Sequence, residues 1–412
     1  MNRLDIKGIG ISASIRPEYL LIAFSGGFTN PQTHYNMRKN ICLPAEWEPQ
    51  SMVMLTWPHQ DTDWRPFLND ITETYVQMAS AITRFEPLVI ATPHPIQVGA
   101  LLGGRLSREQ MTRVYICHCK SNDTWARDHG PITLKERPTA TDDSSNAAPR
   151  STDNRTPLTM LDFRFNGWGD KFEASLDNKI TRTLHADGAF DTAETGTPRL
   201  ADNDDFVLEG GSIESDGEGT IFTTDFCLLA PHRNQPLNQE EIEEELRFRL
   251  KAKRIIWLHH GALIGDDTDG HIDTSVRIAP DNTLLYHKCC DTTDEQYEDF
   301  CALEAELREL RTMQGEPYHL IPLPQPHAIY DDGEKLYDTP AADRDRLPAT
   351  YANFLIINGA VLVPTYNQDE NDKAACEAIA MAFPDREIIP IDSRTIVRQH
   401  GSIHCCTMQV PR

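Results

Sequence analysis

A chain of 412 residues with 63 acidic and 39 basic side chains has a formal net charge of −24, which disfavours binding to nucleic acid or anionic lipid and favours a cationic ligand. Its ten cysteines are too sparse for a small disulfide scaffold, and several lie in apolar runs, as reduced thiols do in the cytoplasm. No apolar run approaches the roughly 18 residues that a membrane span needs. We therefore expect a cytoplasmic protein without nucleic-acid or membrane partners.

The chain is predicted to begin with a loosely ordered extension at residues 1–41, followed by a single domain over 43–412. In this domain, short apolar runs typical of strands alternate with longer runs of helical period. We expect strands at 53–56, 87–92, 114–119, 206–208, 255–258, 319–323 and 353–363, and helices at 67–85, 239–251, 294–313 and 372–383. Strand, loop and helix recur roughly every 60 to 80 residues. This spacing predicts an α/β fold built as one closed ring of repeated units.

Two polar segments interrupt the alternation. Residues 136–158 are rich in Pro, Thr, Ser, Asp and Asn, which is typical of a flexible insertion. Residues 324–348 form a loop rich in Pro and Asp. We expect this second segment to close over the functional site and to limit what can enter it.

Four polar blocks carry candidate functional residues. Asp128 precedes His-Gly-Pro, where Asp is most often a turn residue, and Glu209 precedes two glycines, where it could merely cap a turn. His271 and Asp273 lie two positions apart, so an extended segment points both to one side; a metal site and a satisfied polar loop are equally compatible with the pair. Cys405, taken alone, is typical of a buried strand thiol. Each block is ambiguous by itself.

Two further clusters resemble metal sites. Cys117, His118 and Cys119 are consecutive, and so are two histidines at 259 and 260. A tetrahedral zinc site needs two properly spaced pairs, and strand alternation turns His118 away from both thiols. We interpret these clusters as structural.

Considered together, the blocks make the chain resemble the agmatine deiminases, a family within the guanidino-group-modifying superfamily that also includes the peptidyl-arginine deiminases. The resemblance spans about 43–412 and rests on six blocks in order, at 122–131, 165–169, 208–215, 268–273, 347–353 and 401–405. It implies a five-bladed α/β propeller, the pentein fold, with ββαβ units in pseudo-fivefold arrangement around a central active site. It also implies that Asp128, His271, Asp273 and Cys405 are catalytic, with Glu209 beside them.

Two positions depart from the family pattern. His400 stands where many members have glycine, although it lies outside the catalytic positions. Cys406 stands where other members often carry an apolar residue, and because side chains alternate along a strand, only one of the adjacent thiols can face the site. We expect Cys405 to be that thiol, and we expect Trp57 and Trp125 to contact the substrate together with Glu209.

These residue types suit the chemistry that the resemblance implies. A guanidinium is a planar cation with a fork of N–H donors, and paired carboxylates such as Asp128 and Asp273 match it. At about 4 Å and an effective dielectric near 20, a bound cation would stabilise a thiolate by about 4 kcal/mol, or roughly three pKa units. Cys405 could then attack the guanidinium carbon, while His271 protonates the departing ammonia and afterwards deprotonates the water that cleaves the thiouronium intermediate. This chemistry requires no metal and no organic cofactor.

The expected enzyme is therefore an agmatine deiminase that produces N-carbamoylputrescine and ammonia, in putrescine and polyamine biosynthesis. A peptidyl-arginine deiminase, which converts arginine residues to citrulline, is the alternative within the same chemistry. Other classes also stay open: a metal-dependent amidohydrolase using His271, Asp273 and His404, and a guanidinium-binding protein without catalysis. The sequence does not decide whether the chain forms a homo-oligomer.

Substrate choice depends on charge near the site. Acidic residues dominate the candidate blocks, which favours an ammonium over a carboxylate. Arg127 and Arg277 are the basic exceptions, and either could instead belong to a structural ion pair.

Overall fold

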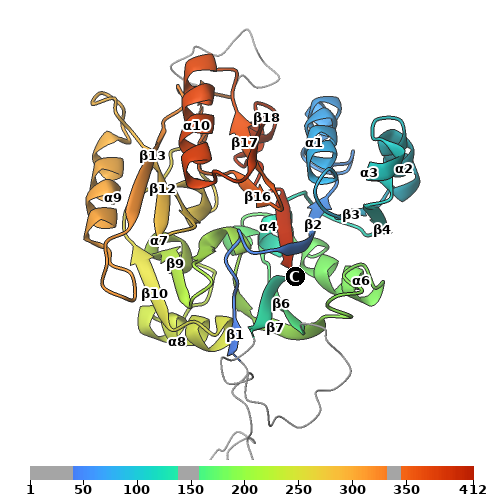
Figure 1. Ribbon diagram of the computed structural model, residues 1–412, viewed down its shortest axis with the longest axis horizontal. Coiled ribbons are helices and arrows are strands. Elements are labelled where there is room, and N and C mark those ends of the chain that lie inside the picture. The colour runs from blue at the N-terminus through green and yellow to red at the C-terminus, as the bar shows by residue number, and fades with distance from the viewer. Residues whose placement is uncertain (1–39, 138–156, 332–344) are drawn as a thin grey trace, which may run out of the picture. The chain divides into compact units, whose positions relative to one another are not determined.

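The computed structural model describes residues 40–137, 157–331 and 345–412 (Figure 1). Nearly all of the predicted extension at 1–41 and most of the predicted insertion at 136–158 lie outside these ranges, as do residues 332–344 of the predicted loop at 324–348. The described residues belong to one compact unit that spans 39–412.

Five sheets of three or four strands and one short two-stranded ladder occur in the described residues. The four-stranded sheets are β1(Asn40–Cys42)-β5(Ile132–Arg137)-β6(Leu158–Arg164)-β7(Arg199–Val207) and β19(Thr407–Pro411)-β2(Gln50–Thr56)-β3(Leu88–Thr92)-β4(Val114–His118). The three-stranded sheets are β10(Arg254–Leu258)-β9(Thr220–Thr224)-β8(Ile213–Ser215), β11(Val276–Ala279)-β12(Thr283–Lys288)-β13(His319–Pro324) and β16(Leu355–Ile357)-β17(Ala360–Thr365)-β18(Glu387–Asp392). The ladder joins β14(Ile329–Tyr330) to β15(Arg346–Leu347).

All five sheets combine an antiparallel pair with a parallel pair. In the sheet of β16, β17 and β18, for example, β16 pairs antiparallel with β17, and β17 pairs parallel with β18. Helices cross over between neighbouring parallel strands, because parallel neighbours cannot be joined by a tight turn. The main crossover helices, one for each sheet, are α1(Leu68–Ile82), α6(Ile180–Ala186), α8(Gln239–Leu250), α9(Tyr297–Glu309) and α10(Asp369–Ala382). The sheet of β2, β3 and β4 has a second crossover, between β3 and β4, which is made by two shorter helices. The predicted α/β fold is confirmed.

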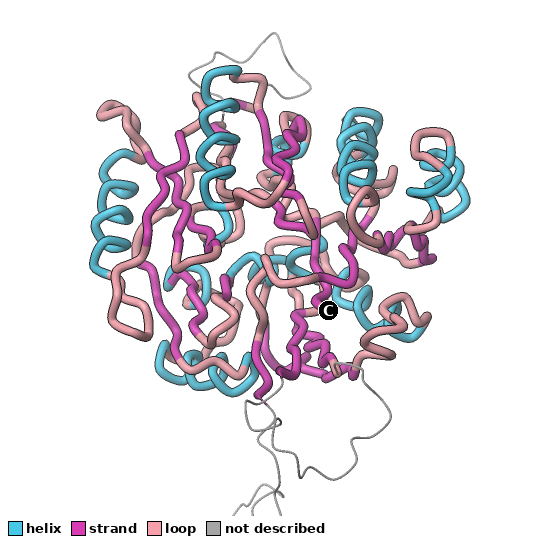
Figure 2. Tube along the Cα trace, viewed as in Figure 1, coloured by secondary structure: helices cyan, strands magenta, loops and turns pink. Residues whose placement is uncertain are grey.

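Shorter helices complete the described structure. They are α2(Pro95–Gly103), α3(Arg108–Met111), α4(Ala126–His129), α5(Gly167–Asp170), α7(Asp225–Leu228), η1(Arg65–Phe67), η2(Asp177–Lys179), η3(Gly210–Ser212), η4(Ile272–Thr274) and η6(Ile396–Gln399). In Figures 1 and 2 the crossover helices lie toward the edges of the view, whereas α4 lies near its centre. Within the described ranges, none of the helices has the length and apolar character needed to span a bilayer.

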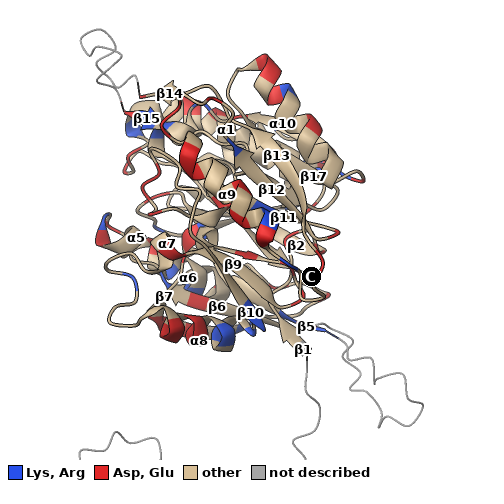
Figure 3. Ribbon diagram, turned by 90° about the vertical axis from the view of Figure 1, so that its left-hand side faces the viewer, with Lys and Arg blue, Asp and Glu red and all other residues tan. Residues whose placement is uncertain are grey.

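Local sequence explains the main elements. Residues Leu355–Ile357 and Ala360–Thr365 form the predicted hairpin, and Gly359 takes the positive φ of 77° that its tight turn requires. Helix α8 starts at Asn238, whose side chain accepts from the N–H of Glu241 while the Glu241 carboxylate accepts from the N–H of Asn238. Helices α8, α9 and α10 contain many Asp and Glu residues, which Figure 3 marks in red, and their charge accounts for part of the large negative net charge.

Five of the six polar blocks directly precede a strand that pairs antiparallel with a neighbour. The blocks at 122–131, 208–212, 268–274, 347–353 and 401–405 lead into β5, β8, β11, β16 and β19, respectively. These five strands belong to five different sheets. The candidate residues Asp128, Glu209, Asp273 and Cys405 therefore precede strands of four different sheets.

Packing of the crossover helices should dominate stability. Ile379 on α10 is fully buried in an apolar cluster, while Met381 on the same helix is 71% exposed. We predict that Ile379→Ala lowers the free energy of unfolding by about 2 to 5 kcal/mol, because it leaves a cavity. Met381→Ala should change it by less than about 0.5 kcal/mol. Chemical denaturation of both variants measures the difference, and equal losses would contradict the packing described here.

Candidate active site

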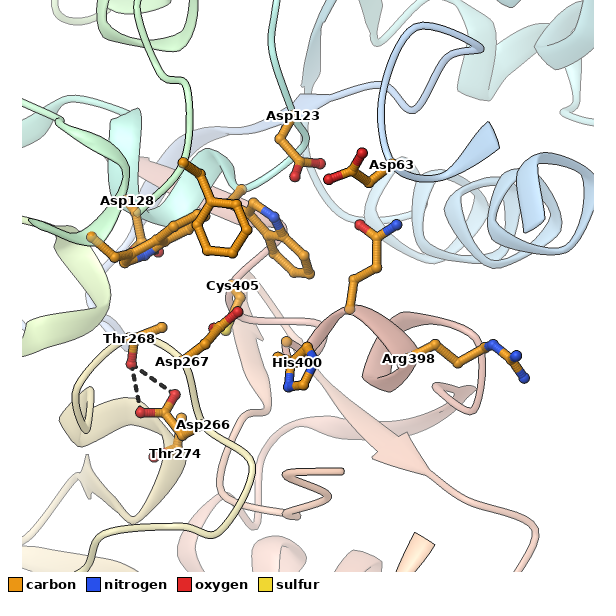
Figure 4. A pocket seen from close by; sticks show the side chains of 15 residues that line it. Asp63, Asp123, Asp128, Asp266, Asp267, Thr268, Thr274, Arg398, His400 and Cys405 are labelled. Carbon is orange, nitrogen blue, oxygen red and sulfur yellow. Dashed lines mark hydrogen bonds between the residues drawn. The ribbon is translucent and has the colours of Figure 1, made fainter. Parts of the chain in front are cut away.

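A cavity of about 230 Å³ opens beside the polar blocks. Its lining comes from residues far apart in the sequence: Asp63, Asp123, Trp125, Asp128, Trp168, Phe172, Asp266, Asp267, Thr268, Thr274, Arg398, Gln399, His400, Gly401 and Cys405. Figure 4 shows Cys405 near the middle of this group, with Asp63 and Asp123 side by side on one side and Asp267 on another. The cavity is thus acidic, with a thiol among its lining groups.

Asn353, which belongs to the sequence block at 347–353, holds Cys405 in place. The Asn353 side-chain oxygen accepts from the backbone N–H of Cys405 at 3.2 Å and lies 3.3 Å from its Sγ. The Asn353 amide nitrogen donates to the backbone carbonyl of Asp273 at 3.3 Å. Asp273 Oδ2 lies 3.9 Å from the Cys405 Sγ. Asn353 therefore fixes the thiol beside a carboxylate.

Asp128 is held by two N–H donors. The backbone N–H of Gly211 donates to Oδ1 at 3.0 Å, and the indole N–H of Trp168 donates to Oδ2 at 3.0 Å. Gly211 cannot carry a side chain here, because a Cβ would lie 2.5 Å from His271 Nδ1 and 3.0 Å from Asp128 Oδ1. Trp168 sits at φ 58° between two glycines of positive φ, a turn that presents its indole to the carboxylate.

His271 and Glu209 lie behind the cavity wall, fully buried. His271 Nδ1 is 3.7 Å from Asp128 Oδ1, and its Nε2 is 4.0 Å from Glu209 Oε2. Among the described residues, neither imidazole nitrogen has a hydrogen-bond partner, and neither does Glu209 Oε2 or Asp273 Oδ1. The other Glu209 oxygen accepts from Arg233 Nε at 2.9 Å. Buried polar atoms are normally paired, so these four atoms mark a site that is completed by a ligand or by water.

Burial and charge set the protonation states of the site. Burial raises the pKa of Asp128 to about 6, with repulsion from Asp273 and Glu209 adding to the rise and His271 opposing it. Burial would also raise the pKa of Asp273, but the hydrogen bond and charge of His404 outweigh it and lower that pKa. Burial and the charges of Asp273 and Asp128 raise the pKa of the Cys405 thiol well above its usual value. Without a ligand, Cys405 is therefore a protonated thiol beside the ionised carboxylate of Asp273.

The surroundings of His271 favour its charged form. Burial disfavours its charged form, yet the charge of Asp128, the adjacent Cys227 side chain and the charge of Glu209 together raise the pKa of His271 well above its usual value. The imidazole is therefore a proton donor near neutral pH.

The structure brings most of the predicted site residues together, but it separates Trp57 from them. Trp125 lines the cavity, and a Cβ at Gly401 would lie 2.1 Å from its ring. Trp57 is 3% exposed and packs edge-on against Tyr75, with ring centroids 5.5 Å apart. It lines a separate cavity beside His59, so its position gives no support for the predicted contact with a substrate.

Arg127 and Arg277 are structural ion-pair residues. Arg127 Nη1 lies 2.9 Å from Glu46, and Arg277 lies 2.6 Å from Glu46 and 2.5 Å from Glu214. Neither lines the acidic cavity. Sequence reasoning missed Arg398, which does line it; Figure 4 shows its guanidinium turned away from Cys405, and it lies 4.0 Å from the ring centroid of Phe67.

Three groups in the described part of the chain bring metal-ligand atoms within 4.8 Å of one another. They are His59, Asp61 and His94; Glu209, Cys227 and His271; and Glu46, Glu214 and His404. His271, Asp273 and His404, the predicted alternative metal site, do not form one of these groups. Asp273 is instead hydrogen-bonded to His404 Nδ1 at 2.7 Å.

Comparisons with known proteins agree with this geometry. A family model described as Porphyromonas-type peptidyl-arginine deiminase matches residues 42–411. The chain belongs to this family.

Its relatives include enzymes named agmatine deiminase. The agmatine deiminase of Medicago truncatula is 32% identical over 387 residues, covering 90% of this chain and 96% of the relative. A solved agmatine deiminase of C. jejuni with substrate bound, in which a cysteine is replaced by serine, is 33% identical with a TM-score of 0.75, covering 92% and 98%. A Porphyromonas gingivalis structure, provisionally described as an arginine deiminase, is 46% identical with a TM-score of 0.77, covering 90% and 99%. The resemblance to the agmatine deiminases is confirmed.

The raised pKa of Cys405 generates a labelling prediction. Neutral iodoacetamide at pH 7.5 should modify the exposed thiols of Cys290 and Cys301 well before Cys405, because only thiolates react. Cationic 2-chloroacetamidine should modify Cys405 first, since its charge is attracted to the two carboxylates. Peptide mass spectrometry over time measures both orders. Preferential labelling of Cys405 by iodoacetamide would contradict the protonation states given above.

Proposed function

We propose that this protein is an agmatine deiminase that hydrolyses agmatine to N-carbamoylputrescine and ammonia, a step toward putrescine. The observation that carries the proposal is the pair of buried carboxylates, Asp128 and Asp273, whose charges both act on the Cys405 thiol. Polar atoms of His271, Glu209 and Asp273 that have no partner among the described residues belong to the same site. This arrangement needs a positive charge and several N–H donors, and a guanidinium supplies both.

In this proposal, the substrate activates its own nucleophile. A guanidinium between the carboxylates offsets their charge, and its attraction for a thiolate lowers the pKa of Cys405. Sγ then bonds to the guanidinium carbon and forms a tetrahedral adduct. The protonated His271 gives its proton to the leaving nitrogen as the carbon–nitrogen bond breaks, which releases ammonia and leaves a thiouronium.

The second half of the reaction returns the thiol. His271, now neutral, takes a proton from a water molecule, and the water oxygen bonds to the thiouronium carbon. The carbon–sulfur bond then breaks, and the proton of the new hydroxyl group passes to the departing sulfur, which restores the Cys405 thiol and leaves a neutral carbamoyl product. The proton that Cys405 loses when the substrate binds goes to solvent, where the released ammonia takes one up. Glu209, anchored by Arg233, faces the second imidazole nitrogen and stabilises the charge that His271 carries before the first proton transfer and after the second.

We also propose that the five sheets are the blades of a five-bladed α/β propeller within a single catalytic domain over 43–412. The shared order of antiparallel pair, crossover helix and parallel strand supports this arrangement. So does the placement of five polar blocks, each before a strand that forms an antiparallel pair in a different sheet.

Two adjacent cysteines allow a matched test of the nucleophile. Cys405 lines the cavity, whereas Cys406 is fully buried in an apolar cluster that contains Tyr75, and burial raises the pKa of Cys406 to about 12. We predict that Cys405→Ser lowers kcat at least about 1,000-fold while agmatine still binds, because a serine hydroxyl stays protonated near neutral pH. Cys406→Ser should retain turnover within about threefold of wild type. Steady-state kinetics and calorimetry of both variants provide the measurement; a dead Cys406→Ser enzyme would reassign the nucleophile.

Charge in the cavity predicts the choice among guanidino substrates. Asp63, Asp123 and Asp267 favour the ammonium of agmatine, and a carboxylate brought near them without a partner costs several kcal/mol. We predict that kcat/KM for agmatine exceeds that for free arginine by at least about 100-fold. Ammonia release from agmatine, arginine and an internal-arginine peptide measures the order.

The peptide separates the two deiminase assignments. It lacks the charged carboxylate of free arginine, so only the shape of the cavity can exclude it. Turnover of the peptide comparable to that of agmatine would replace the agmatine assignment with a peptidyl-arginine deiminase.

A further inference from the structure

His404 lies between two carboxylates at the back of the candidate active site. Its Nδ1 is 2.7 Å from Asp273 Oδ2, and its Nε2 is 2.8 Å from Glu46 Oε1. The residue is fully buried and directly precedes Cys405. One imidazole therefore connects the carboxylate beside the thiol to a second carboxylate farther from the cavity.

Three other side chains hold the Glu46 carboxylate in place. Its two oxygens accept from Arg127 at 2.9 Å, Arg277 at 2.6 Å and Gln409 at 3.2 Å. Burial would raise the pKa of Glu46, but His404 and the two arginines outweigh it and lower that pKa well below its usual value. The network gives the far edge of the imidazole a fixed, charged neighbour.

The orientation of the ring follows from these contacts. Nε2 lies within hydrogen-bond distance of both Glu46 and Arg277 Nη2, the latter at 3.1 Å, so it has a partner whether it donates or accepts. Nδ1 faces only a carboxylate oxygen and must therefore donate its N–H to Asp273. This bond engages Oδ2 and leaves Oδ1, which has no partner among the described residues, for a ligand.

Asp273 needs this donor more than an exposed carboxylate would. It is fully buried, and it shares the site with Asp128, a second carboxylate whose charge adds to the cost of ionising either group. Trp168 and Gly211 satisfy Asp128, but they do not reach Asp273. Without His404, protonation of Asp273 would relieve the repulsion and remove one anchor for a guanidinium.

We propose that His404 is a positioning residue that keeps Asp273 ionised and turns its free oxygen toward the substrate, through the N–H at Nδ1. The role deepens the function proposed above and rests on it, because it requires a cationic substrate bound at Asp273. The neighbouring Glu46, Arg127 and Arg277 act one step farther away by fixing the ring.

Two amides separate this role from simple packing. An asparagine at position 404 places its amide nitrogen near the position of Nδ1, and a glutamine places its amide nitrogen near that of Nε2. His404→Asn therefore keeps a hydrogen-bond donor for Asp273, whereas His404→Gln keeps the contact with Glu46 and loses the hydrogen bond to Asp273.

We expect His404→Asn to keep KM for agmatine within about threefold of wild type, and His404→Gln to raise KM at least about tenfold, because a charge-assisted hydrogen bond to the anchor is lost. Agmatine affinity should follow the same order when the two substitutions are made in the Cys405→Ser protein and measured by calorimetry. Thermal unfolding of each variant provides the readout of packing.

Each outcome decides the inference. Equal changes of KM in the two variants, or wild-type KM in His404→Gln, would overturn it. If His404→Gln does not fold, His404→Ala takes its place with the same expected rise in KM. If neither of these variants folds while His404→Asn does, the role of His404 is purely structural and the inference is overturned. If the wild-type protein neither binds nor converts agmatine, the proposed function itself is rejected. If wild-type turnover is normal and the His404→Asn and His404→Gln variants are indistinguishable, only the role of His404 is rejected.

Discussion

The structure depends on holding two carboxylates close to one thiol in a buried place. Two like charges in such a site would normally protonate or separate. Here Asp128 receives N–H donors from Gly211 and Trp168, and Asp273 receives one from His404. The donors orient the carboxylates but do not neutralise them. A cationic ligand therefore supplies what the folded chain leaves incomplete, which gives binding and activation of the thiol the same physical origin.

The repeated plan of the sheets makes this arrangement possible. Five polar blocks directly precede strands of five different sheets, so residues separated by long stretches of sequence reach one cavity. The crossover helices pack in the apolar clusters and do not supply the reactive groups. Trp125, Trp168 and Cys405 belong to the same apolar cluster as residues of α1, so packing of that helix supports the site directly.

Sequence alone pointed to the candidate site residues through their order in separate blocks, but it did not find the residues that hold them in place. Glu46 lies in no recognisable block, and its partner His404 is 358 positions away. Trp168 and Asn353 belonged to matched blocks without an evident chemical role until their contacts with Asp128 and Cys405 appeared. Trp57 shows the reverse case, since an aromatic residue beside a predicted loop packs away from the cavity. Contacts between distant positions are fixed by the three-dimensional fold, which periodicity and spacing describe only in outline.

The paired carboxylates also bear on how the site empties. The proposed product carries a neutral carbamoyl group where the substrate carried a guanidinium, so the attraction of Asp128 and Asp273 for that group is gone once the thiouronium has been hydrolysed. Repulsion between Asp128 and Asp273 then returns, and fresh substrate relieves it better than the product does. The same electrostatic arrangement that captures the substrate thus disfavours product inhibition.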